Sequence, residues 1–76
     1  LMTANADVAE FMPSEGSKVT QKPVKDLGLP VGMTIGGLVR DGVGMLVSGN
    51  TMIQPGDSVM VFCHNVNMKK IEKYFI

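Results

Sequence analysis

Arg40 is the residue of this chain whose type and position most readily suggest chemistry. It is the single arginine among 76 residues, and it ends an apolar stretch that contains Gly36 and Gly37. A guanidinium group binds phosphate or carboxylate through two parallel hydrogen bonds, so Arg40 could hold an anionic ligand. Alternatively, Arg40 pairs with Asp41 or another neighbour at a turn, which is a structural role. The sequence leaves both interpretations open.

Cys63 and His64 are the other side chains that nucleophilic or metal chemistry commonly uses. Consecutive residues of a strand point to opposite faces, so this pair is poorly placed to act as nucleophile and base. A structural zinc site takes four ligands, and the chain has one cysteine and one histidine. The single cysteine also permits no internal disulfide, and a reducing cytoplasm is the simplest compartment for it.

The seven carboxylates do not form the spaced pair that acid–base catalysis uses. Asp41 and Asp57 have turn positions that explain them without a catalytic role. The glycines do not spell a dinucleotide fingerprint or a phosphate-binding loop, since no Gly-Lys-Ser/Thr sequence follows them. We therefore expect a domain that is not an enzyme, has no catalytic or metal-binding residues and holds no cofactor of its own.

The amino-acid composition limits the kinds of partner that this chain can be expected to bind. Seven basic and seven acidic residues give a net charge of zero, so the chain lacks the electrostatic footprint of a nucleic-acid-binding protein. Near-zero net charge with few charged residues also favours self-association. No apolar run approaches the length of about 20 residues that spans a bilayer, so direct membrane insertion is not expected. Seven methionines suit core filling and adaptable interfaces.

The length corresponds to one small domain, which is marginal alone and gains stability from a partner. We expect residues 1–7 to be a lead-in with little structure and residues 8–76 to form this single domain. Because the chain begins with Leu1 and not with methionine, we interpret it as a fragment of a longer protein.

The hydrophobic pattern predicts an α+β fold: a small mixed, mainly antiparallel β-sheet with a short helix after the first strand and a C-terminal helix. The near-unbroken apolar run at 33–39 is typical of a strand buried on both faces. Asp41-Gly42 predicts a hairpin turn, and Asn65 is a candidate cap for the last helix. In the strand at 58–63, alternate residues should face opposite ways. The other predicted elements are strands at 8–12 and 44–47, extended pieces at 18–20 and 51–53, and a short helix at 23–28.

Six segments follow one another in an informative order and spacing. Two of them are Thr34-Ile35-Gly36-Gly37-Leu38-Val39-Arg40-Asp41-Gly42 and Gln54-Pro55-Gly56-Asp57-Ser58-Val59-Met60-Val61-Phe62. The others are Val8–Phe11, Gly16–Val19, Lys22–Pro30 and Ile71–Phe75. Together they resemble the TrkA-C (RCK-C) domain, the C-terminal regulatory domain of Trk/Ktr-type potassium uptake regulators, over residues 8–76.

The resemblance implies a cytoplasmic lobe that follows a Rossmann-like nucleotide-binding domain outside this chain, where NAD or ATP would bind. It implies a homodimer and a membrane potassium channel or transporter subunit as partner. The domain would then lie at the inner membrane peripherally, through that partner.

In some relatives the dimer of such lobes binds cyclic di-AMP in a cleft between subunits. The resemblance places this ligand at a set of residues on two of the matching segments: Ile35, Gly36, Leu38, Arg40, Asp41 and Pro55. Two alternatives stay open, namely a purely structural dimerisation lobe with no ligand and a non-catalytic domain of a larger enzyme.

Overall fold

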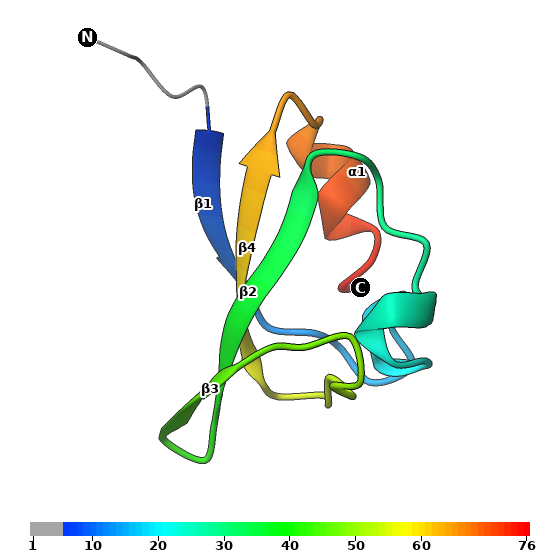
Figure 1. Cartoon of the computed structure of the whole chain (residues 1–76). Helices are drawn as coiled ribbons and strands as arrows, with labels where there is room; N and C mark the ends of the chain where they lie inside the picture. Colours follow the sequence, from blue (N-terminus) through cyan, green and yellow to red (C-terminus); the bar gives the residue numbers. More distant parts are fainter. Residues whose placement is uncertain (1–5) are drawn as a thin grey trace, which may run out of the picture.

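The computed structural model describes residues 6–76, which form one four-stranded sheet with the strand order β1-β4-β2-β3. Every strand pairing among these residues is antiparallel. The helical segments all lie on one side of the sheet (Figure 1), which confirms the predicted α+β class. The strands are β1 (Ala6–Phe11), β2 (Met33–Arg40), β3 (Val43–Leu46) and β4 (Ser58–His64), and the helical segments are η1 (Lys18–Thr20), η2 (Val24–Asp26) and α1 (Met68–Glu72).

The core lies between the sheet and the helical segments. On β4, Val59, Val61 and Cys63 are buried while the alternate residues are more exposed, as the period of two predicts. The C-terminal segment closes this core, because Ile71 and Phe75 are both buried. Ile71, Phe75 and the buried residues of β4 belong to one hydrophobic cluster, which also contains Val19, Met33, Ile35, Leu38 and Ile53.

The prediction that residues 33–39 are buried on both faces is wrong. Within β2, Ile35 and Leu38 are buried against the core, whereas Thr34 and Val39 are exposed on the other face. An apolar run can therefore mark a strand with one open apolar face as well as a strand with two covered faces. Hydrophobicity alone does not separate these cases.

Gly36 is the extra residue of a β-bulge in β2. Ile35 lies opposite Val61 and Gly37 lies opposite Met60, so Gly36 has no partner of its own in β4. A bulge shifts the alternation of the strand by one residue. Side chains three positions apart on β2 can therefore both face the core.

Several boundaries differ from the sequence prediction. Residues 18–20 form the 3₁₀ turn η1 and not an extended piece, 51–53 form no strand, and the helix predicted at 23–28 is only the 3₁₀ turn η2. Asn67, not Asn65, caps α1, because its side-chain oxygen accepts a hydrogen bond from the Lys69 N–H at 2.9 Å.

The N-terminal boundary also moves. β1 begins at Ala6, inside the stretch predicted as a lead-in, because this segment pairs with β4 as far as His64. The rest of that predicted lead-in, residues 1–5, lies outside the described residues.

The β2–β3 hairpin projects from the body of the molecule (Figure 1). Asp41 and Gly42 make its two-residue turn with positive φ angles of 50° and 77°, as their sequence predicts. β3 is an edge strand that pairs with β2 alone among the described strands. Within residues 6–76, no helix combines the length and the apolar character needed to cross a membrane.

Candidate functional site

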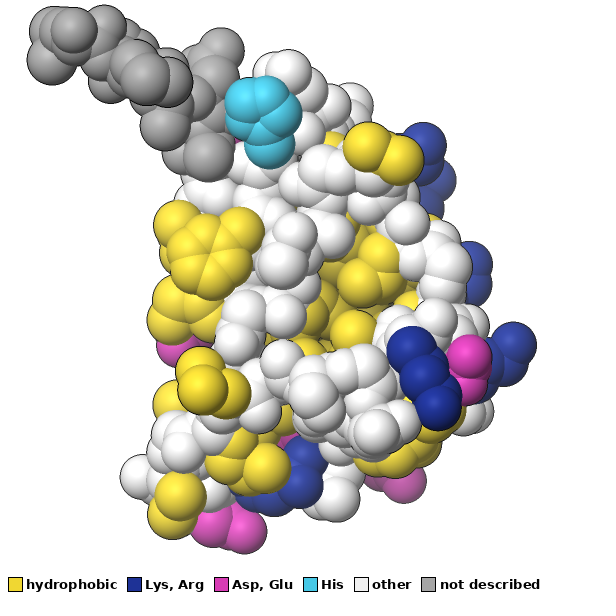
Figure 2. All heavy atoms as spheres, in the orientation of Figure 1, with side chains coloured by type: hydrophobic (Ala, Val, Ile, Leu, Met, Phe, Trp, Pro, Cys, Tyr) yellow, Lys and Arg dark blue, Asp and Glu magenta, His cyan; other side chains and the backbone are white. Residues whose placement is uncertain are grey.

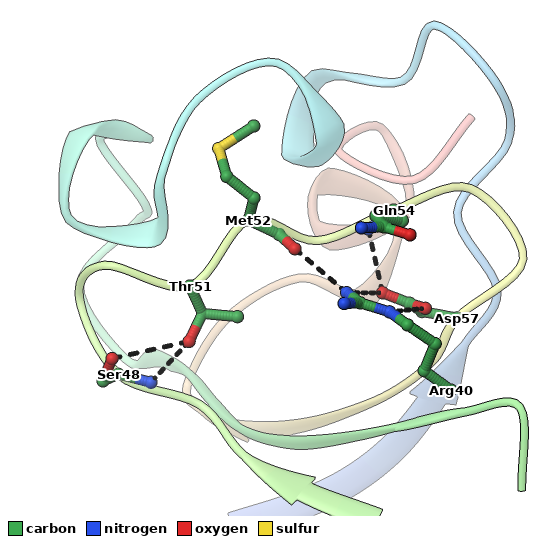
Figure 3. Close-up of polar contacts among 6 residues, drawn as sticks. All are labelled: Arg40, Ser48, Thr51, Met52, Gln54 and Asp57. Carbon is green, nitrogen blue, oxygen red and sulfur yellow. Dashed lines mark hydrogen bonds and ion pairs between the residues drawn. The ribbon is translucent and has the colours of Figure 1, made fainter. Parts of the chain in front are cut away.

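Arg40 is held by a carboxylate that lies on a distant part of the chain. Its Nε donates to Oδ1 of Asp57 at 2.9 Å, and its Nη2 donates to Oδ2 at 2.8 Å (Figure 3). Nη2 also donates to the carbonyl oxygen of Met52 at 3.0 Å. The bidentate pair joins the end of β2 to the turn that precedes β4.

Asp57 is the buried member of this pair, with a side chain that is 2% exposed. Its Oδ2 also accepts a hydrogen bond from the backbone N–H of Gln54 at 2.8 Å, so the same carboxylate closes the turn. The hydrogen bonds from Arg40 lower the pKa of Asp57, although burial opposes them. The same pairing raises the pKa of Arg40. The carboxylate and the guanidinium therefore stabilise each other in their charged forms.

Arg40 makes an ion pair, as the structural interpretation expects, but its partner differs from the one named first. Asp41 is exposed at the tip of the hairpin, and the pairing carboxylate is Asp57, 17 residues along the chain. The sequence prediction gave Asp57 a turn role only. The register of β2 against β4 would have indicated the pair. Val39 lies opposite Ser58, so Arg40, which follows Val39, lies near Asp57, which precedes Ser58.

The remaining residues of the predicted ligand set lie in different surroundings. Ile35 and Leu38 place their side chains in the core, and Asp41 and Pro55 are exposed in separate turns. Gly36 lies on the bulge. Within a single chain these residues do not line one cavity, so the cyclic dinucleotide site stays a prediction.

A hollow of about 290 Å³ lies on the face of the sheet that carries no helices. Gly36 and Gly37, which have no side chains, form part of its floor. A Cβ atom added at Gly36 would lie 2.5 Å from the ring of Phe62, so this ring covers the glycine. Of the predicted ligand residues, only Gly36 and Leu38 line the hollow. The complete lining is Glu10, Gly36, Gly37, Leu38, Val39, Ser58, Met60 and Phe62.

Six of these lining residues lie outside the predicted set. Two of them, Gly37 and Val39, are next to predicted residues on β2. The other four are Glu10, Ser58, Met60 and Phe62. They come from β1 and β4, and they meet β2 only because β4 lies between the other two strands. No local motif signals that order. The one available signal was the alternation in β4, which predicts that Ser58, Met60 and Phe62 share a face.

The described residues contain no cluster of three or more His, Cys, Asp and Glu side chains that could hold a metal ion. Cys63 is buried, and burial raises the pKa of its thiol, so the reactive thiolate is disfavoured. His64 is exposed on the opposite face of β4, and Nδ2 of Asn65 donates a hydrogen bond to its Nε2 at 3.2 Å. The two side chains are thus separated, as their adjacency in a strand predicts.

Comparison with known proteins gives one consistent result. Residues 8–76 match the sequence profile of the TrkA-C domain. The chain is 33% identical over 75 residues to the Trk system potassium uptake protein TrkA of Azorhizobium caulinodans, which covers 99% of this chain and 16% of that protein. It is 30% identical over 70 residues to TrkA homolog 1 of Methanosarcina mazei, covering 92% of this chain and 16% of the relative. The chain thus spans about a sixth of the length of these relatives, and it belongs to the TrkA-C domain family.

Proposed function

We propose that this chain is a regulatory domain of a potassium transport system that dimerises and senses a ligand. The observation that carries the proposal is the match to the TrkA-C domain over nearly the whole chain. The relatives reported above are potassium uptake proteins by name, which supports transport over the alternative of a larger enzyme. The role is regulation and not catalysis.

The proposed partners follow from the same relationship. A membrane potassium channel or transporter subunit would receive the signal, on the cytoplasmic side of the membrane. A nucleotide-binding domain elsewhere in the parent protein would hold NAD or ATP, and this domain would hold neither. The relatives are about six times longer than the matched segment, which leaves room for such a domain.

Regulation requires two arrangements of the domain pair with different affinities for the ligand. A ligand shifts the balance between them only by the difference in its binding free energy to each. Cyclic di-AMP at Ile35, Gly36, Leu38, Arg40, Asp41 and Pro55 would act in this way from a cleft between two copies. One feature supports an anion there: Nη1 of Arg40 has no acceptor among the described residues, so one edge of the guanidinium group remains open.

A second candidate function is a purely structural dimerisation lobe that binds no ligand. The hydrogen bonds of Arg40 favour this second candidate, because Nε and Nη2 already donate to Asp57 and to the carbonyl oxygen of Met52. A ligand that needs the full guanidinium fork would have to break these bonds. The two candidates therefore differ in the role of Arg40, which binds a ligand in the first and only holds Asp57 in the second.

Calorimetric titration of cyclic di-AMP separates the two candidates, with NAD and ATP as controls. The ligand-sensing domain binds one cyclic di-AMP per two chains, and Asp41→Ala or Pro55→Ala weakens binding about tenfold without unfolding the chain. These exposed positions are preferable to Arg40, whose removal would leave Asp57 buried and unpaired. Absence of heat from a confirmed dimer would favour the structural lobe and contradict ligand sensing.

A further inference from the structure

The outer face of the sheet, opposite the helical segments, is unusually apolar. In an antiparallel sheet with one solvated face, that face normally carries polar side chains. Here hydrophobic side chains gather over the strands and the hairpin (Figure 2), and they stand exposed on all four strands. The apolar members, which define the outer face below, are Val8, Val39, Leu46, Met60 and Phe62, each of them exposed. An apolar patch of this kind marks an interaction site.

The shape of the outer face is complementary to itself. Leu46 projects from β3 with 92% of its surface exposed. It lies directly opposite Gly37, so both positions face the same way, and Gly37 lines the hollow. A projecting side chain and a recess thus lie next to each other on one face. In a two-fold symmetric dimer, each projection can enter the recess of the other copy.

The charge of the face also suits a second copy. Glu10 is the one ionisable side chain that lines the hollow, and the lining is otherwise apolar, glycine or serine. The whole chain has a net charge of zero, so two copies approach without long-range repulsion. A highly charged partner would meet a single charged side chain, Glu10, in this lining.

The available area fits a small dimer interface that includes the hairpin. The four strands have 6, 8, 4 and 7 residues, so at about 3.3 Å per residue and about 4.8 Å between strands the sheet presents roughly 400 Å². A specific interface needs at least about 500 Å² from each partner. The flat sheet therefore falls short of this threshold, and the exposed side chains that project from it, Val39 and Leu46 of the hairpin among them, supply the remaining area. An occupant much smaller than the face would leave most of these side chains in water.

We propose that a second copy of this chain covers the outer face, with Leu46 of each copy inserted into the hollow of the other. The side chain lies between Met60 and Phe62, above the glycine floor of the recess. This inference rests on the proposed dimer and adds which face forms it. The interface is isologous, so each hollow is complete only when the partner's leucine fills it.

The first test compares matched charge substitutions by analytical ultracentrifugation of the 76-residue chain over a range of concentrations. Leu46→Glu places a carboxylate in the apolar recess and weakens the dimer at least 100-fold. Val31→Glu is the control, since Val31 is 98% exposed and lies outside the sheet, and it leaves the dimer intact. Equal dimerisation of both variants would overturn the assignment of the face but leave a dimer. A wild-type chain that stays monomeric at every concentration would overturn the dimer itself.

The second test locates the leucine directly. Leu46 and Met60 lie on strands separated by β2, so their Cα atoms are about 10 Å apart, beyond the roughly 7 Å reach of a disulfide within one chain. Oxidising a mixture of the Leu46→Cys and Met60→Cys variants should give the mixed disulfide dimer in higher yield than either variant alone. The oxidised wild type controls for Cys63, which is buried. A mixed yield no higher than that of the single variants would contradict the insertion.

Discussion

Both faces of the sheet carry large hydrophobic side chains, but those of the inner face are buried and those of the outer face are exposed. The inner face carries Val59 and Val61 with almost no exposed surface, whereas Met60 and Phe62, between and beside them on the same strand, are exposed. Alternate side chains of β4 therefore belong to two different surfaces, the core and the outer face. Burial by the chain's own helices accounts for the inner set. No helical segment among the described residues covers the outer set, and a second copy would cover it.

The largest expected effect contrasts two phenylalanines. Phe75 is buried and stacks on Phe11 with ring centroids 4.6 Å apart, so Phe75→Ala should destabilise the monomer by about 3–5 kcal/mol. Phe62→Ala, on the outer face, should cost less than about 1 kcal/mol under monomeric conditions, because the ring is partly solvated. Urea unfolding of dilute protein measures both. Equal losses would mean that the outer face is already part of the monomer's core.

The next largest effect concerns the ion pair between Arg40 at the end of β2 and Asp57 in the turn before β4. Asp57→Asn removes the charge that Arg40 binds and should destabilise the chain by about 2 kcal/mol. Asp41→Asn is the matched control, because Asp41 is exposed at the hairpin tip and asparagine tolerates its positive φ angle, so the loss stays within about 0.5 kcal/mol. Chemical unfolding at neutral pH compares them. A small loss for Asp57→Asn would show that the pair is dispensable.

A smaller effect is expected from the glycine under the Phe62 ring. Gly36→Ala places a methyl group where the ring lies, so the ring must move and the hollow changes shape. We expect about 1 kcal/mol of destabilisation in the monomer and a clear weakening of the dimer. Gly44→Ala, where an added Cβ has no heavy atom within 4 Å, should change neither. Matching behaviour of the two variants in sedimentation and unfolding would contradict the proposed role of the hollow.

The smallest effect is a pH dependence. The pKa of Asp57 is lowered in the folded state, so its contribution to stability is fully present above the unfolded-state pKa of about 4. It is lost as the pH falls from that value through the lower folded-state pKa. The free energy of unfolding of the wild type should therefore fall more steeply below pH 4 than that of Asp57→Asn. Parallel curves for the two proteins would contradict the assigned pairing.

Local rules predicted the parts of the fold that depend on neighbouring residues. The Asp41-Gly42 turn and the alternation of β4 follow from the φ preferences of turn residues and from the period of a strand. The burial of β2 did not follow, because the bulge at Gly36 and the open outer face are properties of strand pairing. An apolar run has the same sequence whether its second face is covered by the same chain or left open.

The candidate site was less predictable than the fold for the same reason. The bond between Arg40 and Asp57 depends on the register of β2 against β4, and the hollow depends on β4 lying between β1 and β2. Residue type and position indicated Arg40, and the family resemblance supplied Gly36 and Leu38, but neither supplied the residues that surround them. Contacts between distant segments become visible only once the strand order is known.

The most direct test of the central claim, that a second copy covers the outer face, uses the methyl groups of two methionines. Met60 lies on the outer face and is 39% exposed, and Met52 lies in the loop before β4 and is 42% exposed. Methyl NMR spectra recorded during dilution should show a concentration-dependent shift for Met60 and none for Met52. A dimer that dissociates while the Met60 signal stays unchanged would contradict the account.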